Sequence, residues 1–196
     1  MTPPDYSFYL VELAAYRMSG QETCASLFTV IVRPTAEAKD FGEQRKDLAE
    51  RDILRMRFWT ELLENAKKRG VMVHAQRAPS TDNWLSAGAG AQSGLSFVYL
   101  VWLKEESAVE LYIDVGEEDQ NRLIFDELRK QKEAVEAVFG APLFWDALDG
   151  RRASRVRFTI REGGLLDQEK WPKIQDAMIA AMGKLSNALR PFLGRG

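Results

Sequence analysis

Arginines gather near the end of the chain in a pattern typical of one strand face. Arg155, Arg157 and Arg161 alternate with apolar residues at positions 156, 158 and 160, so a strand would project all three from the same side. Arg151 and Arg152 precede that strand in an expected turn. Guanidinium groups can hold phosphates through paired hydrogen bonds, so these five arginines form a candidate nucleic-acid contact.

The alternative for these arginines is ion pairing within the protein. Glu110 and Asp114 fall on one face of an earlier strand, and opposite charges on neighbouring strands attract each other. The pattern favours ion pairing over phosphate binding, although each role can hold for different arginines. Of the five tryptophans, Trp84 stands beside a segment of small residues and is the one to test as a base-stacking side chain; we expect the others to anchor the core.

Three further patterns could do chemistry, but none predicts a site. The glycine-rich segment 88–94 has no strand–glycine loop–helix context and no Gly-Lys-Ser/Thr, so we expect a connecting loop. Cys24 and His74 are the only residues of their types, which excludes an internal disulfide and leaves no metal-ligand spacing. Glu37 begins an acid-x-lysine match to metal-dependent nucleases, but it lies in an expected connector. We therefore predict no metal and no cofactor.

Composition narrows the class of protein. The 196 residues include 45 % hydrophobic residues, enough for a substantial core. The net charge of −2 argues against a general polyanion binder, although a local basic patch remains compatible with it. The chain has no apolar run of membrane-spanning length and no signal-like start, and its single cysteine suits a reducing compartment. We expect a cytoplasmic protein with no membrane partner.

Hydrophobic periodicity predicts an α+β fold, mainly an antiparallel sheet, in the order helix, hairpin, helix, hairpin, helix, after an N-terminal β-hairpin. The expected helices span 47–69, 117–139 and 168–193. The two long central strands fall within 94–115, with Val109, Leu111 and Ile113 on one face. We assign residues 1–46 to the hairpin and a connector, and 47–196 to the α+β domain. The other expected strands span 6–18, 27–32, 71–78, 143–145 and 155–162.

Several dispersed motifs carry a resemblance to a known family. They lie at 57–63, 109–114, 125–128, 143–148 and 152–156, with Trp171-Pro172 opening the last helix. From about 52 to 193 the chain resembles the bacterial domain-of-unknown-function family numbered 4268. Members often follow a restriction-endonuclease-like nuclease domain, and the front hairpin resembles the end of such a domain. The catalytic acids of that domain are absent here, so the resemblance implies a nuclease-associated module without its own active centre.

Two functions therefore compete. The first is a non-catalytic accessory module of a DNA-processing or defence-type protein, which binds DNA through the arginine strand or positions a partner such as a nuclease subunit. That function predicts salt-sensitive binding. The second is a protein-interaction or homodimerisation scaffold with no nucleic-acid role, suggested by the near-neutral charge, the heptad-like last helix and the front hairpin. An enzyme in its own right is the third and weakest hypothesis.

Overall fold

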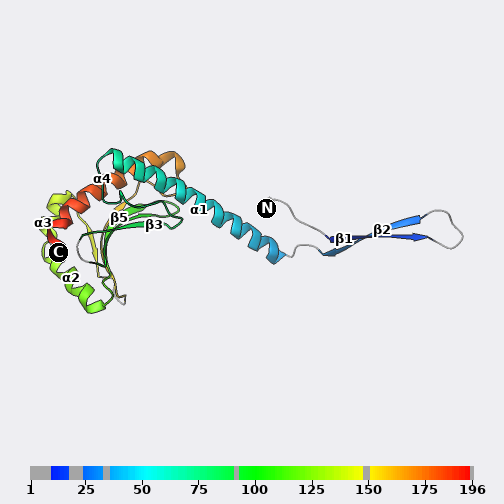
Figure 1. The fold of residues 1–196 in the computed structure, drawn as a ribbon, viewed down its shortest axis with the longest axis horizontal. Coiled ribbons are helices and arrows are strands. Elements are labelled where there is room, and N and C mark those ends of the chain that lie inside the picture. The colour runs from blue at the N-terminus through cyan, green and yellow to red at the C-terminus, as the bar shows by residue number, and fades with distance from the viewer. Residues whose placement is uncertain (1–9, 18–23, 33–35, 91–92, 148–150, 195–196) are drawn as a thin grey trace. The chain divides into compact units, whose positions relative to one another are not determined.

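The computed structural model describes residues 10–17, 24–32, 36–90, 93–147 and 151–194 (Figure 1). The chain divides into two compact units, Met1–Arg51 and Asp52–Gly196. Helix α1 (Ala36–Lys68) contributes residues to both. Residues 36–46, expected as a connector, are thus helical, in keeping with their lack of proline and β-branched residues.

The described strands of the first unit form the predicted N-terminal hairpin. Strand β1 (Leu10–Arg17) pairs antiparallel with β2 (Cys24–Val32), and Leu13 lies directly opposite Phe28. Cys24 begins β2 opposite Arg17, so its predicted place in the hairpin loop is wrong. Positions 6–9 and 18 of the first predicted strand lie outside the described residues.

The second unit is built on a five-stranded antiparallel sheet with the strand order β3-β4-β5-β7-β6, which confirms the α+β class. The predicted order of alternating helices and hairpins is not confirmed, because three strands rather than two lie between α1 and α2. The strands are β3 (Trp84–Gly88), β4 (Leu95–Val101), β5 (Ser107–Ile113), β6 (Phe144–Asp146) and β7 (Ser154–Ile160).

The additional strand is β3, in a stretch expected mostly as loop. Its residues Ser86 to Gly88 pair with Val98 to Ser96 of β4, while Leu85 and Ala87 are buried on the helix side. Small residues therefore serve here as strand residues on a closely packed sheet, which their composition alone does not reveal. Residues 73–76 form a turn and the rest of 71–78 has no regular structure, so the short strand predicted there is wrong.

The helices follow the predicted positions with two changes. The helix expected over 117–139 is divided into α2 (Glu118–Lys130) and α3 (Lys132–Phe139), which meet at Gln131. The last helix, α4 (Trp171–Leu189), is flanked by single 3₁₀ turns at Gln168–Lys170 and Arg190–Phe192. Pro172 occupies its first turn, where a missing backbone N–H is harmless.

One face of the sheet is packed by helices. Helix α4 contacts β4, β5 and β7, and Phe58 of α1 meets Trp171 of α4 edge to face at 5.3 Å (Figure 1). Side chains of period two fill this face, as predicted for Val109, Leu111 and Ile113. The other strand residues in this core are Leu85, Leu95, Phe97, Tyr99, Val101, Val156 and Ile160. The alternating side chains must therefore emerge on the opposite face.

His74 is buried beside this core in a neutral form. Its Nε2 lies 3.1 Å from the carbonyl oxygen of Leu85 and 3.0 Å from that of Phe97, and its ring is 4.5 Å from Tyr99. A nitrogen between two carbonyls acts as the donor, which leaves the buried Nδ1 without a partner among the described residues. Burial lowers the pKa of His74 to about 4, because a charged ring would lose its hydration.

This burial predicts an acid-dependent loss of stability. The pKa of His74 is near 6.5 in the unfolded chain and about 4 in the folded chain. Between these two pH values the unfolded chain therefore binds a proton at His74 that the folded chain does not bind. The stabilisation of the fold by neutral His74 is fully present above pH 6.5. It is lost as the pH falls toward 4, which lowers the free energy of unfolding by up to about 3 kcal/mol. Urea unfolding at pH 7, 6, 5 and 4 should show a flatter profile for His74→Gln than for the wild type. Parallel profiles would contradict this assignment.

Candidate functional site

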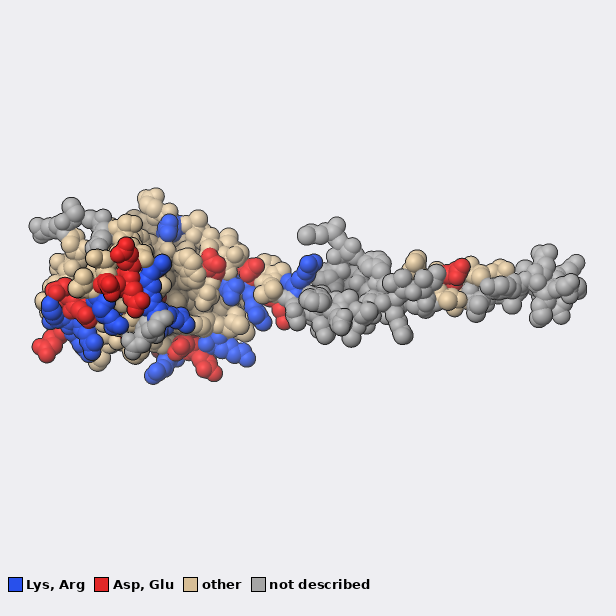
Figure 2. Space-filling view, turned by 90° about the horizontal axis from the view of Figure 1, so that it is seen from below, with Lys and Arg blue, Asp and Glu red and all other residues tan. Residues whose placement is uncertain are grey.

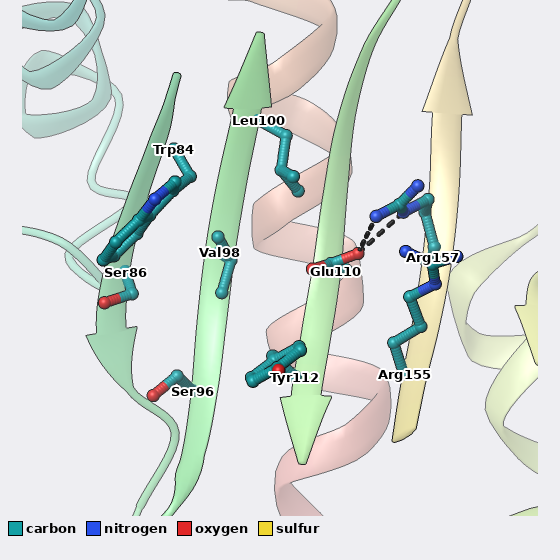
Figure 3. A pocket seen from close by; sticks show the side chains of 9 residues that line it. All are labelled: Trp84, Ser86, Ser96, Val98, Leu100, Glu110, Tyr112, Arg155 and Arg157. Carbon is teal, nitrogen blue, oxygen red and sulfur yellow. Dashed lines mark hydrogen bonds and ion pairs between the residues drawn. The ribbon is translucent and has the colours of Figure 1, made fainter. Parts of the chain in front are cut away.

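The face of the five-stranded sheet opposite α4 contains a hollow of about 390 Å³ (Figure 3). We call this face the open face. Four strands contribute to the hollow, and none of its described lining residues belongs to a helix. Its lining consists of Trp84, Ser86, Ser96, Val98, Leu100, Glu110, Tyr112, Arg155 and Arg157.

Strand register explains why the hollow forms there. Ser86, Val98, Glu110 and Arg157 are successive partners across β3, β4, β5 and β7, so their side chains form one row across the sheet. The first two members of this row are short. One neighbouring row carries the larger Trp84 and Leu100, and the other runs from Gly88 and Ser96 to Tyr112 and Arg155. The short side chains of β3 and β4 therefore leave a depression, with Trp84 and Leu100 at one end and Tyr112 and Arg155 beyond it on β5 and β7.

An ion pair closes one end of this central row. Glu110 is only 4 % exposed, and both Nε and Nη2 of Arg157 lie 2.6 Å from its Oε2. The Arg157 guanidinium also lies over the Trp102 ring at 5.2 Å. Burial raises the pKa of Glu110, and the Arg157 charge opposes that rise. The second carboxylate oxygen of Glu110 points away from Arg157 (Figure 3).

Two further arginines are also paired. Arg155 directs Nε and Nη2 to Oδ2 of Asp146 on β6, at 3.1 and 2.8 Å. Arg152 lies outside the hollow and binds Asp114 in a bidentate manner, at 2.8 and 2.7 Å, and this contact lowers the pKa of Asp114. The ion-pairing alternative therefore describes Arg152 and Arg157 with the acids expected from sequence, whereas the partner of Arg155 was not foreseen.

The remaining arginines lie elsewhere. Arg161 follows the last residue of β7 and lines a separate hollow with Lys104, Asp167 and Lys170. Arg151 is exposed in the bend before β7. Of the six residues that sequence singled out, the structure brings Trp84, Arg155 and Arg157 into one hollow and leaves Arg151, Arg152 and Arg161 out of it.

Sequence reasoning missed most of the floor and walls of this hollow. Ser86 fell outside every expected strand, so the strand that borders this face was not recognised. Recognition of a third strand before β4 would have revealed the face. Gly94, the last residue of the glycine-rich segment, has a structural role: its φ is +88°, and a Cβ there would lie 2.6 Å from the carbonyl oxygen of Asp114.

Charge on the second unit is mixed. On the surface seen in Figure 2, basic and acidic side chains are interspersed and do not gather into one basic area. Within the described ranges, no cluster of three or more histidine, cysteine, aspartate or glutamate side chains has a geometry for a metal ion. No described helix is both long and apolar enough to cross a bilayer.

Fold and site together define an α+β module whose antiparallel sheet is packed by helices on one face and hollowed on the other. The sequence profile described as "Domain of unknown function (DUF4268)" matches residues 54–193, and the chain belongs to this family. Neither the search of curated proteins nor the search of solved structures gave a match. The matched range covers nearly all of the second unit, including every residue that lines the hollow.

Removal of Arg157 from its pair with Glu110 and removal of Arg152 from its pair with Asp114 should change the free energy of unfolding by very different amounts. The Arg157 side chain is 14 % exposed, so Arg157→Ala leaves a carboxylate buried without compensation and should lower the free energy of unfolding by about 3 kcal/mol. The Arg152 side chain is 56 % exposed, so Arg152→Ala should lower the free energy of unfolding far less than Arg157→Ala does. Urea unfolding at pH 7 measures both.

A third variant separates lost charge pairing from lost packing. Adding Glu110→Gln to Arg157→Ala removes the unpaired charge, so the double variant should be more stable than Arg157→Ala alone. Equal losses for Arg152→Ala and Arg157→Ala, or no recovery in the double variant, would show that the pair is not buried as described.

Proposed function

We propose that this chain is a non-catalytic accessory module that binds a single nucleic-acid strand on the open face. The observation that carries the proposal is the position of Trp84. Its side chain is 47 % exposed on β3 at the border of the hollow, with Tyr112 across the central row. Aromatic side chains on an open sheet are the usual platforms on which unpaired bases stack.

A single strand suits this surface better than a duplex. Bases in a duplex are stacked on one another and cannot enter a hollow in a sheet, whereas an unpaired base can turn toward the protein. Apolar side chains, Val98, Leu100 and the aromatic rings, make up much of the lining, which favours the faces of bases over phosphate groups.

Arg155 and Arg157 are not free phosphate-binding groups. Arg155 and Arg157 already donate to Asp146 and Glu110, so their charges are largely neutralised. Their remaining N–H groups can still donate to a base edge or a phosphate oxygen at the border of the hollow. We therefore expect base stacking to supply most of the affinity, with a smaller dependence on salt than an unpaired arginine strand would give.

Fluorescence anisotropy of labelled single-stranded and double-stranded DNA tests this proposal. The full chain should bind the single strand more tightly than the duplex and retain most of that affinity between low and near-physiological salt. Trp84→Ala should weaken binding by about tenfold, the effect of losing one stacked base. Phe192→Ala is the matched control, because Phe192 is exposed in the 3₁₀ turn after α4 and does not line the hollow. No binding at low salt would overturn the proposal.

The N-terminal hairpin supports a second function, docking of another protein chain. On one face of this two-stranded sheet Leu13 and Phe28 lie opposite each other and are 62 % and 68 % exposed, with Val11 exposed beside them. A lone two-stranded sheet is marginally stable in water, and both of its strands are edges. A second copy of the chain, which brings the same apolar face, is the partner that we propose.

Oligomeric state tests this second function. Light scattering after gel filtration should give a dimer for the wild type and a monomer for a variant with Leu13→Lys and Phe28→Lys, because two buried charges oppose association. A control variant with Leu123→Lys and Val138→Lys changes two exposed apolar side chains of the second unit and should stay dimeric. A wild type that is monomeric throughout a concentration series would exclude self-association through the hairpin.

A further inference from the structure

The central row of the open face presents an acceptor beside donors. Arg157 occupies Oε2 of Glu110, and the other carboxylate oxygen has no hydrogen-bond partner among the described residues and points away from Arg157 (Figure 3). The guanidinium groups of Arg157 and Arg155 lie on the same side of the hollow. A ligand in the hollow thus meets a carboxylate acceptor and guanidinium donors along one edge.

The space in front of this edge suits a flat ring. Val98 lies in the row between Ser86 and Glu110, and the rings of Trp84 and Tyr112 stand on either side of that row (Figure 3). The volume of about 390 Å³ accommodates a bicyclic base with room for its sugar to reach the surface. Aromatic rings gain most from an occupant with its own π face.

The charges of the lining residues favour some flat ligands over others. Glu110, the one carboxylate among the lining residues, is paired with Arg157, and Arg155 is paired with Asp146, so these residues supply no net negative charge to hold a cationic occupant. A neutral ring with adjacent donors and an acceptor fits better. Guanine offers N1–H and the N2 amino group beside O6, whereas adenine and cytosine place a ring acceptor where the carboxylate needs a donor. Thymine offers one donor and a smaller π face.

We propose that the hollow binds one guanine base, with Glu110 accepting from its N–H edge, an arginine donating to O6, and Trp84 and Tyr112 flanking the ring. The base comes either from a single strand or from a free nucleoside, and both share this edge. The inference deepens the proposed strand binding, since it names the base that occupies the open face. It assigns Trp84 to stacking and Glu110 to base discrimination.

The experiment uses the full chain and four labelled oligonucleotides that are abasic except for a central dG, dA, dC or dT. Anisotropy should show the dG strand bound about tenfold more tightly than the dA strand, the discrimination of one good base contact. Glu110→Gln should remove the preference for dG, because an amide can donate to adenine as well as accept. Trp84→Ala should weaken dG binding by about tenfold, and Phe192→Ala should leave it unchanged. Thermal unfolding checks that each variant is folded.

Titration of free guanosine and free adenosine, followed by the fluorescence of the tryptophans, separates the two sources of the base. Guanosine binding without strand binding would support the guanine site and remove the proposed strand function. Equal binding of all four strands that still depends on Trp84 would overturn the guanine inference and leave strand binding in place. Binding of neither strands nor guanosine, or equal weakening by Phe192→Ala and Trp84→Ala, would overturn the inference. If Glu110→Gln does not fold, the preference for dG over dA is measured in Trp84→Ala: it should persist there, because Glu110 is intact, and its loss would overturn the assignment of base discrimination to Glu110.

Discussion

The ion pair between Glu110 and Arg157 is the contact on which the open face depends. Each charge is removed from water, so each requires the other. The pair also favours one register of β5 against β7, because a slip of β7 by one residue would turn Arg157 toward the apolar core packed by α4 and leave Glu110 buried without its partner. The pairings of β3 with β4 and of β4 with β5 then place Trp84, Val98 and Tyr112 on the same face. A buried ion pair adds little net stability compared with apolar residues of similar size, but it favours one register of β5 against β7 over the others.

A near-neutral charge and a sheet face that no described helix of the second unit covers together limit the ligands that the module can bind. Three of the five clustered arginines have carboxylate partners, and acids and bases alternate over the surface in view (Figure 2). Such a face has little long-range attraction for a polyanion and must recognise its ligand at short range. Short-range recognition requires a concave, preformed surface with a few polar groups, which the hollow supplies. The hairpin of the first unit, with Leu13 and Phe28 exposed, is a separate surface suited to a protein.

The sequence predicted those elements whose apolar period is long and regular. The second half of α1, α4 and the alternation of Val109, Leu111 and Ile113 followed from pattern alone. Strand β3 did not, because Ser86 to Gly88 have neither bulk nor branching, and only pairing with β4 makes them a strand. The missed strand concealed the hollow, so Trp84 was singled out without its surroundings.

The contacts of buried polar residues also could not be predicted from the sequence. Asn121 lies in the helix expected over 117–139 and is buried, because its Oδ1 accepts from the backbone N–H of Val115 and its Nδ2 donates to the carbonyl oxygen of Arg152. Asp146 was unnoticed, since its pairing with Arg155 depends on β6 reaching the sheet edge. Contacts of this kind join segments that are far apart in sequence, and hydrophobic periodicity, which depends on neighbouring residues, does not predict them.

The central claim, that the open face is where a strand binds, is tested most directly by NMR. Amide chemical shifts of the full chain would be followed during titration with a short single-stranded oligonucleotide. The account predicts that the largest shifts occur in β3, β4, β5 and β7, next to Trp84, Val98, Glu110 and Arg157, with the buried surface of α4 unaffected. Shifts confined to other surfaces, or no shifts at saturating oligonucleotide, would contradict it.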